Sequence, residues 1–339
     1  MNTLVLTGGG TAGHVMPALA LVPYLRPYFG AIYYAGEAGG VEERLAASYG
    51  LPFFGTSAIR FDRRRLLRNA AIPRVLATAS REVRGWLAAI HCDVVFSKGG
   101  YCAVPTVLAA HRAGLPIVCH ESDLSIGLAN RLTLRYTPHL ITSFDVTPRG
   151  TFLGNPIRDE VFEGRAERVS VPYPYAPTLL VMGGSMGALA LNEMAVSLAE
   201  RLTGWNVVNL YGRSPVACAR PNYIGVPFAE HVADYYARAD VVLCRSGANT
   251  LFELAALNKP TVTVPLPKGT SRGDQAENAA YFSAKYGFAV FEQSSATADA
   301  LADAVLDALR QAPSSSGVSS PNAAIARYVY EVFRGSRHD

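Results

Sequence analysis

Short runs of apolar and β-branched residues alternate along the chain with longer stretches of helical periodicity. In the first half, the runs lie near Thr3–Thr7, Ala31–Ala35, Pro52–Thr56, Asp93–Ser97, Pro116–His120 and His139–Ser143. This alternation is typical of βα units, in which helices cover the faces of a parallel sheet. The first half therefore predicts a doubly wound α/β domain.

The same plan begins again after the proline-rich stretch 172–177, with the apolar run TLLVM. Further runs lie near Asn206–Leu210, Asn222–Val226, Val241–Cys244, Thr261–Val264 and Ala289–Glu292. A serine-rich break at 314–320 then precedes a last amphipathic helix. The pattern predicts two such domains with a cleft between them, and ligands at the carboxyl ends of the strands.

Composition limits the classes of protein that fit this pattern. The 339 residues suffice for two α/β domains, and no window holds the ~20 uninterrupted apolar residues of a membrane-spanning helix. Met1 runs almost directly into a strand, which leaves no room for a signal peptide, so we expect a soluble cytoplasmic protein. Five scattered cysteines argue against a disulfide framework or zinc site, and a net charge of +4 gives no case for nucleic-acid binding.

A glycine-rich loop follows the first strand, where Gly8, Gly10 and Gly13 have the spacing G-x-G-x-x-G. Such a loop lets an anion approach the backbone N–H groups of a helix N-terminus, and Glu37 stands near the position of a ribose-binding acid. This segment alone is consistent with a nicotinamide-dependent dehydrogenase. His14 directly follows the loop and is either a neutral general base or a packing or capping residue.

The second half contains a matching loop, Gly183–Gly187, again between a strand and a helix. Glu253 lies on the helix after the strand that ends at Cys244, where its carboxylate could accept both hydroxyls of a ribose. Polar side chains that could bind sugar hydroxyls or cap a helix begin the next helix. They are Asp274, Gln275 and Asn278.

Polar residues also follow two strands of the first half. They are Tyr101, His120, Glu121, Ser122, Asp123 and Asn130. Together with glycine-lined loops, they suit an acceptor site that binds anions. Adjacent residues of one loop cannot all point inward, and the chain has no G-x-S-x-G elbow, so we exclude a Ser-His-Asp hydrolase.

Seven motifs, in register over nearly the whole chain, resemble those of the peptidoglycan N-acetylglucosaminyltransferases of glycosyltransferase family 28. They are GGGTAGHV, SKGGY, HESD…GLANR, GNPIR, GGSMGA, RSGANTLFE and RGDQAENA. The resemblance implies the α/β GT-B fold, which has two doubly wound Rossmann-like domains separated by a cleft. We expect an acceptor and membrane-associating domain at 1–158, a donor-binding domain at 159–317, and a helix at 318–339 that packs back on the first domain.

The resemblance also implies an activity. GlcNAc would be transferred from UDP-GlcNAc to the 4-hydroxyl of MurNAc-pentapeptide-pyrophosphoryl-undecaprenol (lipid I), with inversion, to form lipid II. Lipid II would serve peptidoglycan synthesis, and therefore cell-wall biogenesis, cell shape and cell division. The chain has no DxD motif, so we expect catalysis without a metal and without a cofactor, UDP-GlcNAc being a co-substrate.

Residue roles follow where this sequence matches the family. His14 would be the general base, with Glu121 and Asp123 as rivals. The donor would be bound by Arg158, Ser185, Met186, Gly187, Phe228, Ala229, Arg245, Ser246, Asn249, Thr250, Glu253, Asp274 and Gln275. The acceptor would be bound by Gly10, Thr11, Ala12, Gly13, His14, Tyr101 and Asn130.

Some positions depart from the residues common in the family, namely Ala12, Met186, the pair Ser122-Asp123 and Asp274. A carboxylate at Asp123 would repel the acceptor's diphosphate. The departures leave room for a related GT-B enzyme that acts on another glycolipid or a natural product. A UDP-GlcNAc 2-epimerase fits the motifs less well, and a catalytically idle UDP-sugar-binding protein is the alternative from another class.

An arginine cluster between Arg60 and Arg84 is interleaved with apolar residues. It is either a solvated helix face with core residues beneath it or an interfacial helix that binds anionic lipid. The resemblance favours the second interpretation and implies a peripheral position on the inner face of the cell membrane, with contacts to other cell-wall synthesis proteins. The contact residues would be Arg63, Arg64, Arg65, Arg68 and Trp86.

Overall fold

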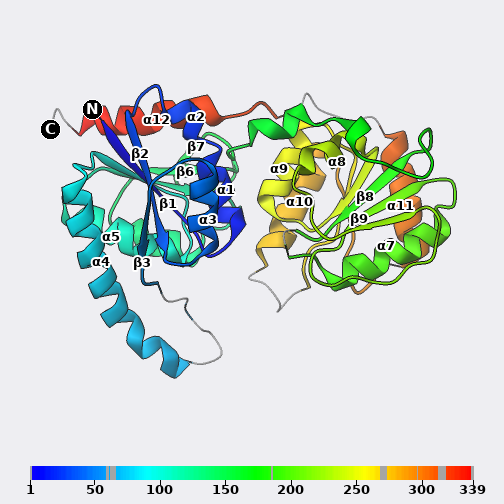
Figure 1. Ribbon diagram of the computed structural model, residues 1–339, viewed down its shortest axis with the longest axis horizontal. Helices are drawn as coiled ribbons and strands as arrows, with labels where there is room; N and C mark the ends of the chain where they lie inside the picture. The colour runs from blue at the N-terminus through cyan, green and yellow to red at the C-terminus, as the bar shows by residue number, and fades with distance from the viewer. Residues whose placement is uncertain are drawn as a thin grey trace. The chain divides into compact units, whose positions relative to one another are not determined.

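The computed structural model describes residues 2–58, 61, 66–184, 186–267, 273–295, 297–311 and 318–336, without the side chains of 66–68. The chain divides into two compact units. Unit 1 comprises Met1–Arg158 with Ser320–Asp339, and unit 2 comprises Asp159–Ser319. Each unit is built around its own parallel sheet (Figure 1).

The sheet of unit 1 has the strand order β3-β2-β1-β4-β5-β6-β7, with every pair parallel. The strands are β1 (Thr3–Thr7), β2 (Ala31–Glu37), β3 (Phe53–Thr56), β4 (Val94–Ser97), β5 (Ile117–Glu121), β6 (Leu140–Thr142) and β7 (Thr151–Phe152). The first six confirm the predicted runs. The strand β7 was missed because two exposed residues give no periodic signal.

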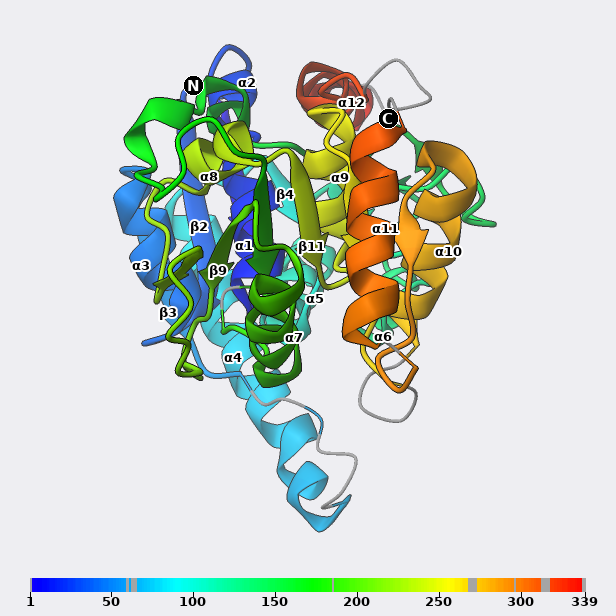
Figure 2. The same cartoon turned by 90° about the vertical axis from the view of Figure 1, so that its right-hand side faces the viewer.

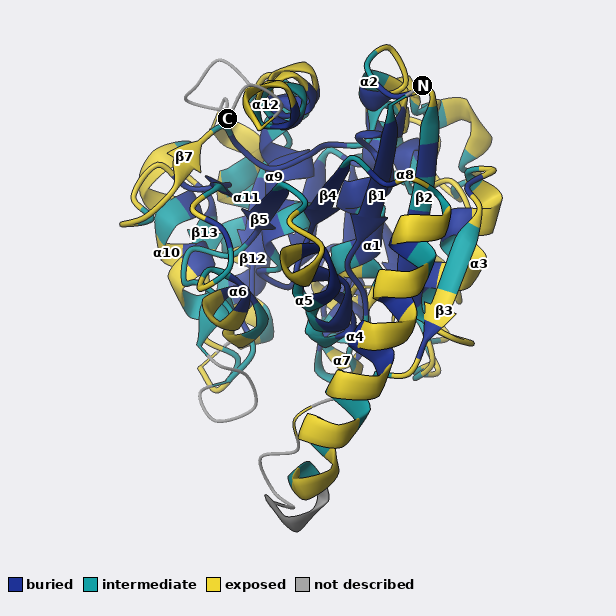
Figure 3. Ribbon diagram, turned by 90° about the vertical axis from the view of Figure 1, so that its left-hand side faces the viewer, coloured by how far each residue is buried: buried dark blue, intermediate teal, exposed yellow. Residues whose placement is uncertain are grey.

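Helices cover both faces of this sheet. They are α1 (Ala12–Leu19), α2 (Val22–Leu25), α3 (Val41–Ser48), α4 (Ile72–Ala89), α5 (Val104–Arg112), α6 (Leu128–Thr133) and α12 (Asn322–Gly335), with 3-10 turns at Leu66–Ala71 and Tyr101–Ala103. Because alternate strand residues face opposite sides, Leu4 and Leu6 pack with α1, α2 and α12, whereas Val5 packs with α4 and α5. Figure 3 shows the resulting buried sheet between helices whose outer faces are exposed.

Unit 2 repeats the plan with the strand order β10-β9-β8-β11-β12-β13. Its strands are β8 (Thr178–Met182), β9 (Asn206–Leu210), β10 (Tyr223–Val226), β11 (Val241–Cys244), β12 (Thr261–Thr263) and β13 (Ala289–Val290). Its helices are α7 (Leu189–Arg201), α8 (Val232–Arg238), α9 (Ala248–Ala256), α10 (Asp274–Tyr286) and α11 (Ala298–Arg310), with 3-10 turns at Asp159–Glu163 and Ala166–Arg168. The helices α7 and α11 share one core and cover one face (Figure 2).

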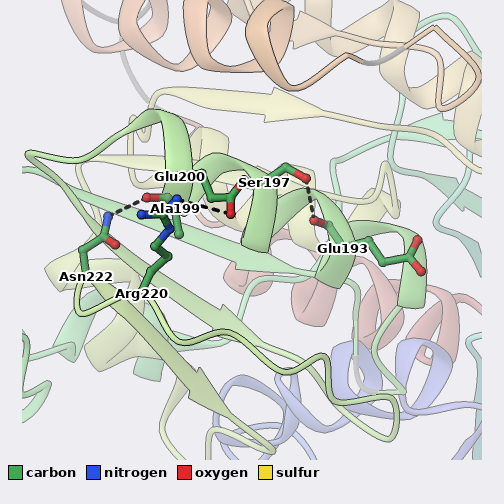
Figure 4. Close-up of polar contacts among 6 residues, drawn as sticks. All are labelled: Glu193, Ser197, Ala199, Glu200, Arg220 and Asn222. Carbon is green, nitrogen blue, oxygen red and sulfur yellow. Dashed lines mark hydrogen bonds and ion pairs between the residues drawn. The ribbon is translucent and has the colours of Figure 1, made fainter.

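A buried amide just before β10 fixes the turn between α7 and β9. The Nδ2 atom of Asn222 donates to the carbonyl oxygens of Ala199, Leu202 and Trp205 at 3.0–3.1 Å. Figure 4 shows the bond from Asn222 to Ala199 beside the exposed pair of Arg220 and Glu200, which lie 3.4 Å apart. The amide satisfies carbonyls that the end of a helix leaves open, and it ties the residue before β10 to the turn that follows α7.

Both sheets have a point at which the strand order reverses. In unit 1 it lies between β1 and β4, and in unit 2 between β8 and β11. In open α/β sheets, ligands bind outside the carboxyl ends of the strands at such a point. The two doubly wound domains predicted from the sequence are therefore confirmed, and each presents one position where a ligand site is expected.

Candidate active site

Two glycine loops meet at the reversal point of unit 1. The first follows β1 and the second follows β4, and the N–H of Gly9 donates to the carbonyl oxygen of Gly99 at 3.3 Å. Gly100 has φ +83°, and a Cβ there would overlap the carbonyl oxygen of Gly9. Only glycine fits this close approach, so the two loops form one backbone surface beside the N-terminus of α1.

His14 and Tyr101 flank this surface. A Cβ added to Gly100 would lie 3.2 Å from Cδ2 of His14, and one added to Gly10 would overlap the ring of Tyr101. The hydroxyl of Tyr101 donates to Oε2 of Glu37 at 2.6 Å. Burial and this hydrogen bond raise the pKa of Tyr101, which stays a neutral donor. Glu37 therefore has a partner within unit 1, rather than standing free for a ribose.

The remaining members of the first loop lie at or near the surface. Thr11 precedes α1 with extended backbone and makes no side-chain cap, and Thr11 and Gly13 are exposed. Ala12 is half-buried. The N–H groups of this loop are thus near the surface at the start of an eight-residue helix, as an anion-binding role requires.

A buried carboxylate supports the loop from below. Glu42 is 1% exposed, and its Oε1 accepts the N–H of Glu37 at 3.1 Å. A Cβ on Gly9 would overlap Oε1 of Glu42. Among the described residues, one group of at least three His, Cys, Asp or Glu side chains has its possible metal-ligand atoms within 4.8 Å of one another. It consists of Glu37, Glu42 and Cys102. The carboxylates of Glu42 and Glu37 accept hydrogen bonds from the N–H of Glu37 and the hydroxyl of Tyr101, so this cluster supports the loop.

Glu121 organises the segment after β5. Its Oε1 accepts the N–H of Asp123 at 3.1 Å, and its Oε2 accepts the N–H of Gly127 at 2.8 Å and Nδ2 of Asn130 at 2.9 Å. Nδ2 of Asn130 also donates to the carbonyl oxygen of His120 at 3.0 Å. Glu121 and Asn130 are 4% and 3% exposed, whereas Asp123 is half-buried. Glu121, which was predicted as a rival base, is surrounded by donors that hold its carboxylate in place.

A fully buried lysine lies where β4 ends. Nζ of Lys98 contacts Nδ1 of His120 at 2.8 Å and donates to Oγ of Ser122. Oγ of Ser122 in turn donates to Oδ1 of Asn155 at 3.2 Å, and Nε2 of His120 lies 3.0 Å from the carbonyl oxygen of Gly154. This network joins the ends of β4 and β5 to the GNPIR segment, which ends at the half-buried Arg158.

The glycine loop of unit 2 follows β8. Gly187 has φ +74° and donates its N–H to the carbonyl oxygen of Gly184 at 2.9 Å, and the side chain of Met186 is 55% exposed. Ser185, predicted to contact the donor diphosphate, lies outside the described residues. The loop leads into α7, a 13-residue helix whose N-terminus favours an anion.

Helix α9 begins after β11, the neighbour of β8 in the sheet. Asn249 and Thr250 lie in its first turn and are half-buried. Glu253 is 8% exposed, and its Oε2 accepts the hydroxyl of Tyr236 at 3.1 Å. A carboxylate oriented by a tyrosine beside a helix N-terminus suits recognition of a vicinal diol.

Several side chains predicted to bind the donor make hydrogen bonds within unit 2. Arg245 is 9% exposed; its Nη1 donates to the carbonyl oxygens of Val264 and Pro265, and its Nη2 to Oε1 of Gln293 at 2.7 Å. These bonds hold the guanidinium in place within unit 2. The other pairs are Ser246 with Thr263 at 2.7 Å, Gln275 with the N–H of Leu266 at 3.0 Å, and Asn278 with the carbonyl oxygen of Ser246 at 3.3 Å.

The other predicted residues lie on the surface or in the packing of their units. Phe228 is 66% exposed after β10, with Ala229 half-buried beside it, and Asp274 is half-buried in the first turn of α10. Trp86 stacks on Phe54 at a ring distance of 4.6 Å, so its indole contributes to the packing of unit 1. Arg63, Arg64 and Arg65 lie outside the described residues, as does the side chain of Arg68.

Sequence reasoning missed three buried groups, Glu42, Lys98 and Tyr236. Glu42 follows a Gly-Gly pair at the start of a helix, and Lys98 interrupts a serine-glycine turn. Both positions are usually exposed, so only the tertiary structure reveals their burial. Tyr236 carries no signal beyond helical periodicity.

Similarity to solved structures defines the class. The crystal structure of Acinetobacter baumannii MurG covers 99% of this chain and 100% of its own, with a TM-score of 0.72 and 24% identity. The glycotransferase of kitacinnamycin covers 99% of this chain and 95% of its own, with a TM-score of 0.70 and 16% identity. These likenesses show the fold, which is that of the GT-B glycosyltransferases.

Sequence similarity then defines the family. Residues 4–141 match the glycosyltransferase family 28 N-terminal domain, and residues 178–327 match its C-terminal domain. The chain belongs to glycosyltransferase family 28. A Lachnospira eligens protein is 36% identical over 83% of this chain and 84% of its own, and a Shouchella clausii protein is 37% identical over 89% of each. Both are named UDP-N-acetylglucosamine--N-acetylmuramyl-(pentapeptide) pyrophosphoryl-undecaprenol N-acetylglucosamine transferase.

Proposed function

We propose that this glycosyltransferase transfers GlcNAc from UDP-GlcNAc to the 4-hydroxyl of lipid I, with inversion, and so forms lipid II. One observation carries the proposal: a glycine loop stands at the reversal point of each sheet, in a chain similar over more than four fifths of its length to enzymes named for this transfer. A two-substrate transfer between two diphosphate-bearing molecules needs two anion sites, and the fold offers one in each unit.

Unit 2 is the donor side of this proposal. The strands β8, β11 and β12 are neighbours, so the helices that follow them, α7, α9 and α10, begin at one edge of the sheet. Their N-termini, with Arg158, stabilise the charge on the departing UDP without a metal. Glu253 binds the ribose hydroxyls, the backbone near Phe228 and Ala229 binds the uracil, and Asp274 binds the GlcNAc.

Unit 1 is the acceptor side, and its glycine loops bind the diphosphate of lipid I. In the transfer, the acceptor's 4-hydroxyl oxygen attacks the anomeric carbon of GlcNAc from the face opposite UDP. The bond between that carbon and the phosphate oxygen breaks, and UDP leaves with the electron pair. His14 takes the hydroxyl proton, which makes it the general base. Tyr101 shapes the loop, and Asn130 orients Glu121.

The experiment that tests the function uses purified protein, UDP-GlcNAc and a short-chain lipid I analogue. We expect stoichiometric formation of UDP and the corresponding lipid II disaccharide, with inverted configuration identified by NMR. Release of UDP without a disaccharide would contradict the proposal. Transfer to a natural-product or other glycolipid acceptor, but not to the lipid I analogue, would contradict the acceptor and support the alternative transferase.

We further propose that unit 1 associates with an anionic membrane surface, where the polyprenyl tail of lipid I resides. Arg74, Arg81 and Arg84 of α4 are exposed, whereas Val83 lies in the core. Figure 3 shows the exposed side of this helix. Within the described part of the chain, no helix is both long and apolar enough to cross a membrane. Exposed arginines on an 18-residue helix support electrostatic attachment.

Co-sedimentation with liposomes tests this attachment. Replacing Arg63, Arg64 and Arg65 together by glutamine should weaken binding to phosphatidylglycerol vesicles at low salt, and replacing Arg74, Arg81 and Arg84 should do so as well. Binding to neutral phosphatidylcholine vesicles is the control, and unchanged binding of both triple variants to anionic vesicles would refute the proposal.

A further inference from the structure

Lys98 is a buried cation beside the glycine loops of unit 1. The residue is 1% exposed, and the contacts of Nζ among the described residues are with His120 and Ser122. Removing an ammonium from water is costly unless nearby groups compensate. A lysine buried at the end of a strand, where a residue would ordinarily reach solvent, therefore calls for a functional explanation.

The two contacts are neutral groups that accept hydrogen bonds. Nε2 of His120 lies 3.0 Å from the carbonyl oxygen of Gly154, which can only accept, so Nε2 carries the hydrogen and Nδ1 accepts from Lys98. Burial and the charge of Lys98 hold the pKa of His120 well below its ordinary value, so the imidazole stays neutral. Oγ of Ser122 accepts a hydrogen bond from Nζ and donates one to Oδ1 of Asn155. Both partners thus orient lone pairs toward the amine.

The negative charges that face Lys98 come from the segment at the end of β5. Burial lowers the pKa of Lys98 to about 7, and this effect outweighs the charges of Glu121 and Asp123, which raise the pKa. From β2, the hydroxyl of Tyr34 reaches the same loop and donates to the carbonyl oxygen of Gly8 at 2.7 Å. Its pKa is raised well above the ordinary value, chiefly by burial, so this group stays uncharged. The charged groups that act on Lys98 are thus Glu121 and Asp123, while the carboxylate of Glu42 lies beneath the Gly9 end of the loop.

Lys98 also stands where the two glycine loops join the sheet. The backbone N–H of Lys98 donates to the carbonyl oxygen of Thr7 at 2.7 Å. A Cβ added to Gly8 would lie 2.9 Å from the Cβ of Lys98. The backbone of Lys98 is therefore at the reversal point between β1 and β4, and its side chain carries the ammonium to His120 and Ser122 at the end of β5. Asp123, on the other side of the network, is the carboxylate whose charge would repel a diphosphate.

We propose that Lys98 is an electrostatic positioning residue of the acceptor site, whose buried charge offsets Asp123 and Glu121 and so lets the glycine loops bind a diphosphate diester. Lys98 acts through the field at the loops and through Ser122, without touching the ligand. The inference rests on the proposed function, because that function places the acceptor's diphosphate at these loops.

Steady-state kinetics with the short-chain lipid I analogue test the inference at saturating UDP-GlcNAc. Lys98→Met removes the charge and keeps most of the side-chain length. We expect the KM for the acceptor to rise on the order of tenfold, the effect of one unit charge in a partly screened interior, with a smaller change in kcat. The Kd for UDP should stay unchanged, because UDP binds unit 2.

Two further variants separate charge from packing. Lys259→Met is the matched control, because Lys259 is a half-buried lysine of unit 2 whose Nζ donates to the carbonyl oxygen of Ala239 at 2.7 Å. Its acceptor KM should equal that of the wild type. Adding Asp123→Asn to Lys98→Met should bring the acceptor KM back to within about threefold of the wild type, because the uncompensated carboxylate is removed.

The pH profile of the wild type gives a test that needs no variant. A diphosphate diester keeps its two charges between pH 6 and 8.5, whereas Lys98 loses its proton around pH 7. The acceptor KM should therefore rise with pH over this range, and the rise should be absent in Lys98→Met. If Lys98→Met does not fold, the wild type still decides: an acceptor KM that does not change between pH 6 and 8.5 overturns the inference.

The outcomes also distinguish this inference from the proposed function. If the wild type makes lipid II but Lys98→Met has an unchanged acceptor KM and pH profile, Lys98 has no electrostatic role. A raised KM that Asp123→Asn fails to lower would equally overturn the compensation. If the wild type makes no lipid II at all, the proposed function fails first.

Discussion

Glu121 offers a sharp test of whether a buried carboxylate acts as a base or as a support. Its two oxygens accept three hydrogen bonds, from the N–H groups of Asp123 and Gly127 and from Asn130. In Glu121→Gln, one oxygen becomes an NH₂ group, which must face a donor. The best orientation places the NH₂ toward Asp123, because the other oxygen accepts two bonds.

The cost follows from these contacts. Losing one hydrogen bond to a charged acceptor costs about 1.5–3 kcal/mol, and the other two bonds weaken when the acceptor becomes neutral. We expect the free energy of unfolding of unit 1 to fall by about 2–4 kcal/mol, which lowers Tm by roughly 5–12 °C for a unit of this size. Faster hydrogen exchange should appear in residues 122–131.

The assay combines differential scanning fluorimetry with hydrogen exchange. Glu43→Gln is the matched control, because Oε2 of the exposed Glu43 accepts one backbone N–H, that of Gly39, at 2.8 Å. Its Tm should change by about 1 °C or less. If Glu121→Gln leaves Tm and exchange unchanged but lowers kcat about a thousandfold, Glu121 is the general base and its supporting role is refuted.

Three other predictions concern the proposed site and its charges. His14→Ala should lower kcat by about 10²–10⁴-fold with the Kd for UDP nearly unchanged, as general-base loss requires, and isothermal titration calorimetry with UDP checks the second part. Glu253→Ala should weaken UDP binding more than Tyr236→Phe, because the tyrosine only orients the carboxylate; equal effects would contradict the ribose role. Since the pKa of Lys98 is lowered to about 7 from 10.5, the unfolded chain binds more protons between these values. The unfolding free energy of the wild type should therefore rise from pH 7 to 9 by up to about 1.4 kcal/mol per pH unit more than that of Lys98→Met; parallel urea-denaturation profiles would count against this.

The sequence predicted the strands and the glycine loops because both depend on local signals. Apolar runs bounded by glycine mark the parallel strands, whereas the close approach of Gly100 to the carbonyl oxygen of Gly9 is seen only in the structure. The carboxyl ends of parallel strands lie at one edge of a sheet, so the loops after β1 and β4 could be assigned to the same edge from the sequence.

The charged groups were harder to predict. Lys98 and Glu42 stand at positions that are usually solvated, and their burial depends on which distant segments pack over them. Arg245 was predicted to bind the donor, and its guanidinium donates to the carbonyl oxygens of Val264 and Pro265 just after β12. The direction of a long side chain is set by tertiary packing, so sequence pattern cannot give it. The roles assigned to individual residues stay predictions.

The last helix gives the chain an order of assembly. Ile325, Val329 and Phe333 of α12 are buried in the core that contains Leu4 and Leu6, and Nδ2 of Asn322 binds the carbonyl oxygen of Ile157 at 2.6 Å. Unit 2 is thus an insertion within unit 1, and it is contiguous in sequence. During synthesis on the ribosome, unit 2 has all of its residues before unit 1 does. Until α12 has been made, the core around Leu4 and Leu6 lacks the helix that completes it, so we expect unit 1 to expose apolar surface during synthesis.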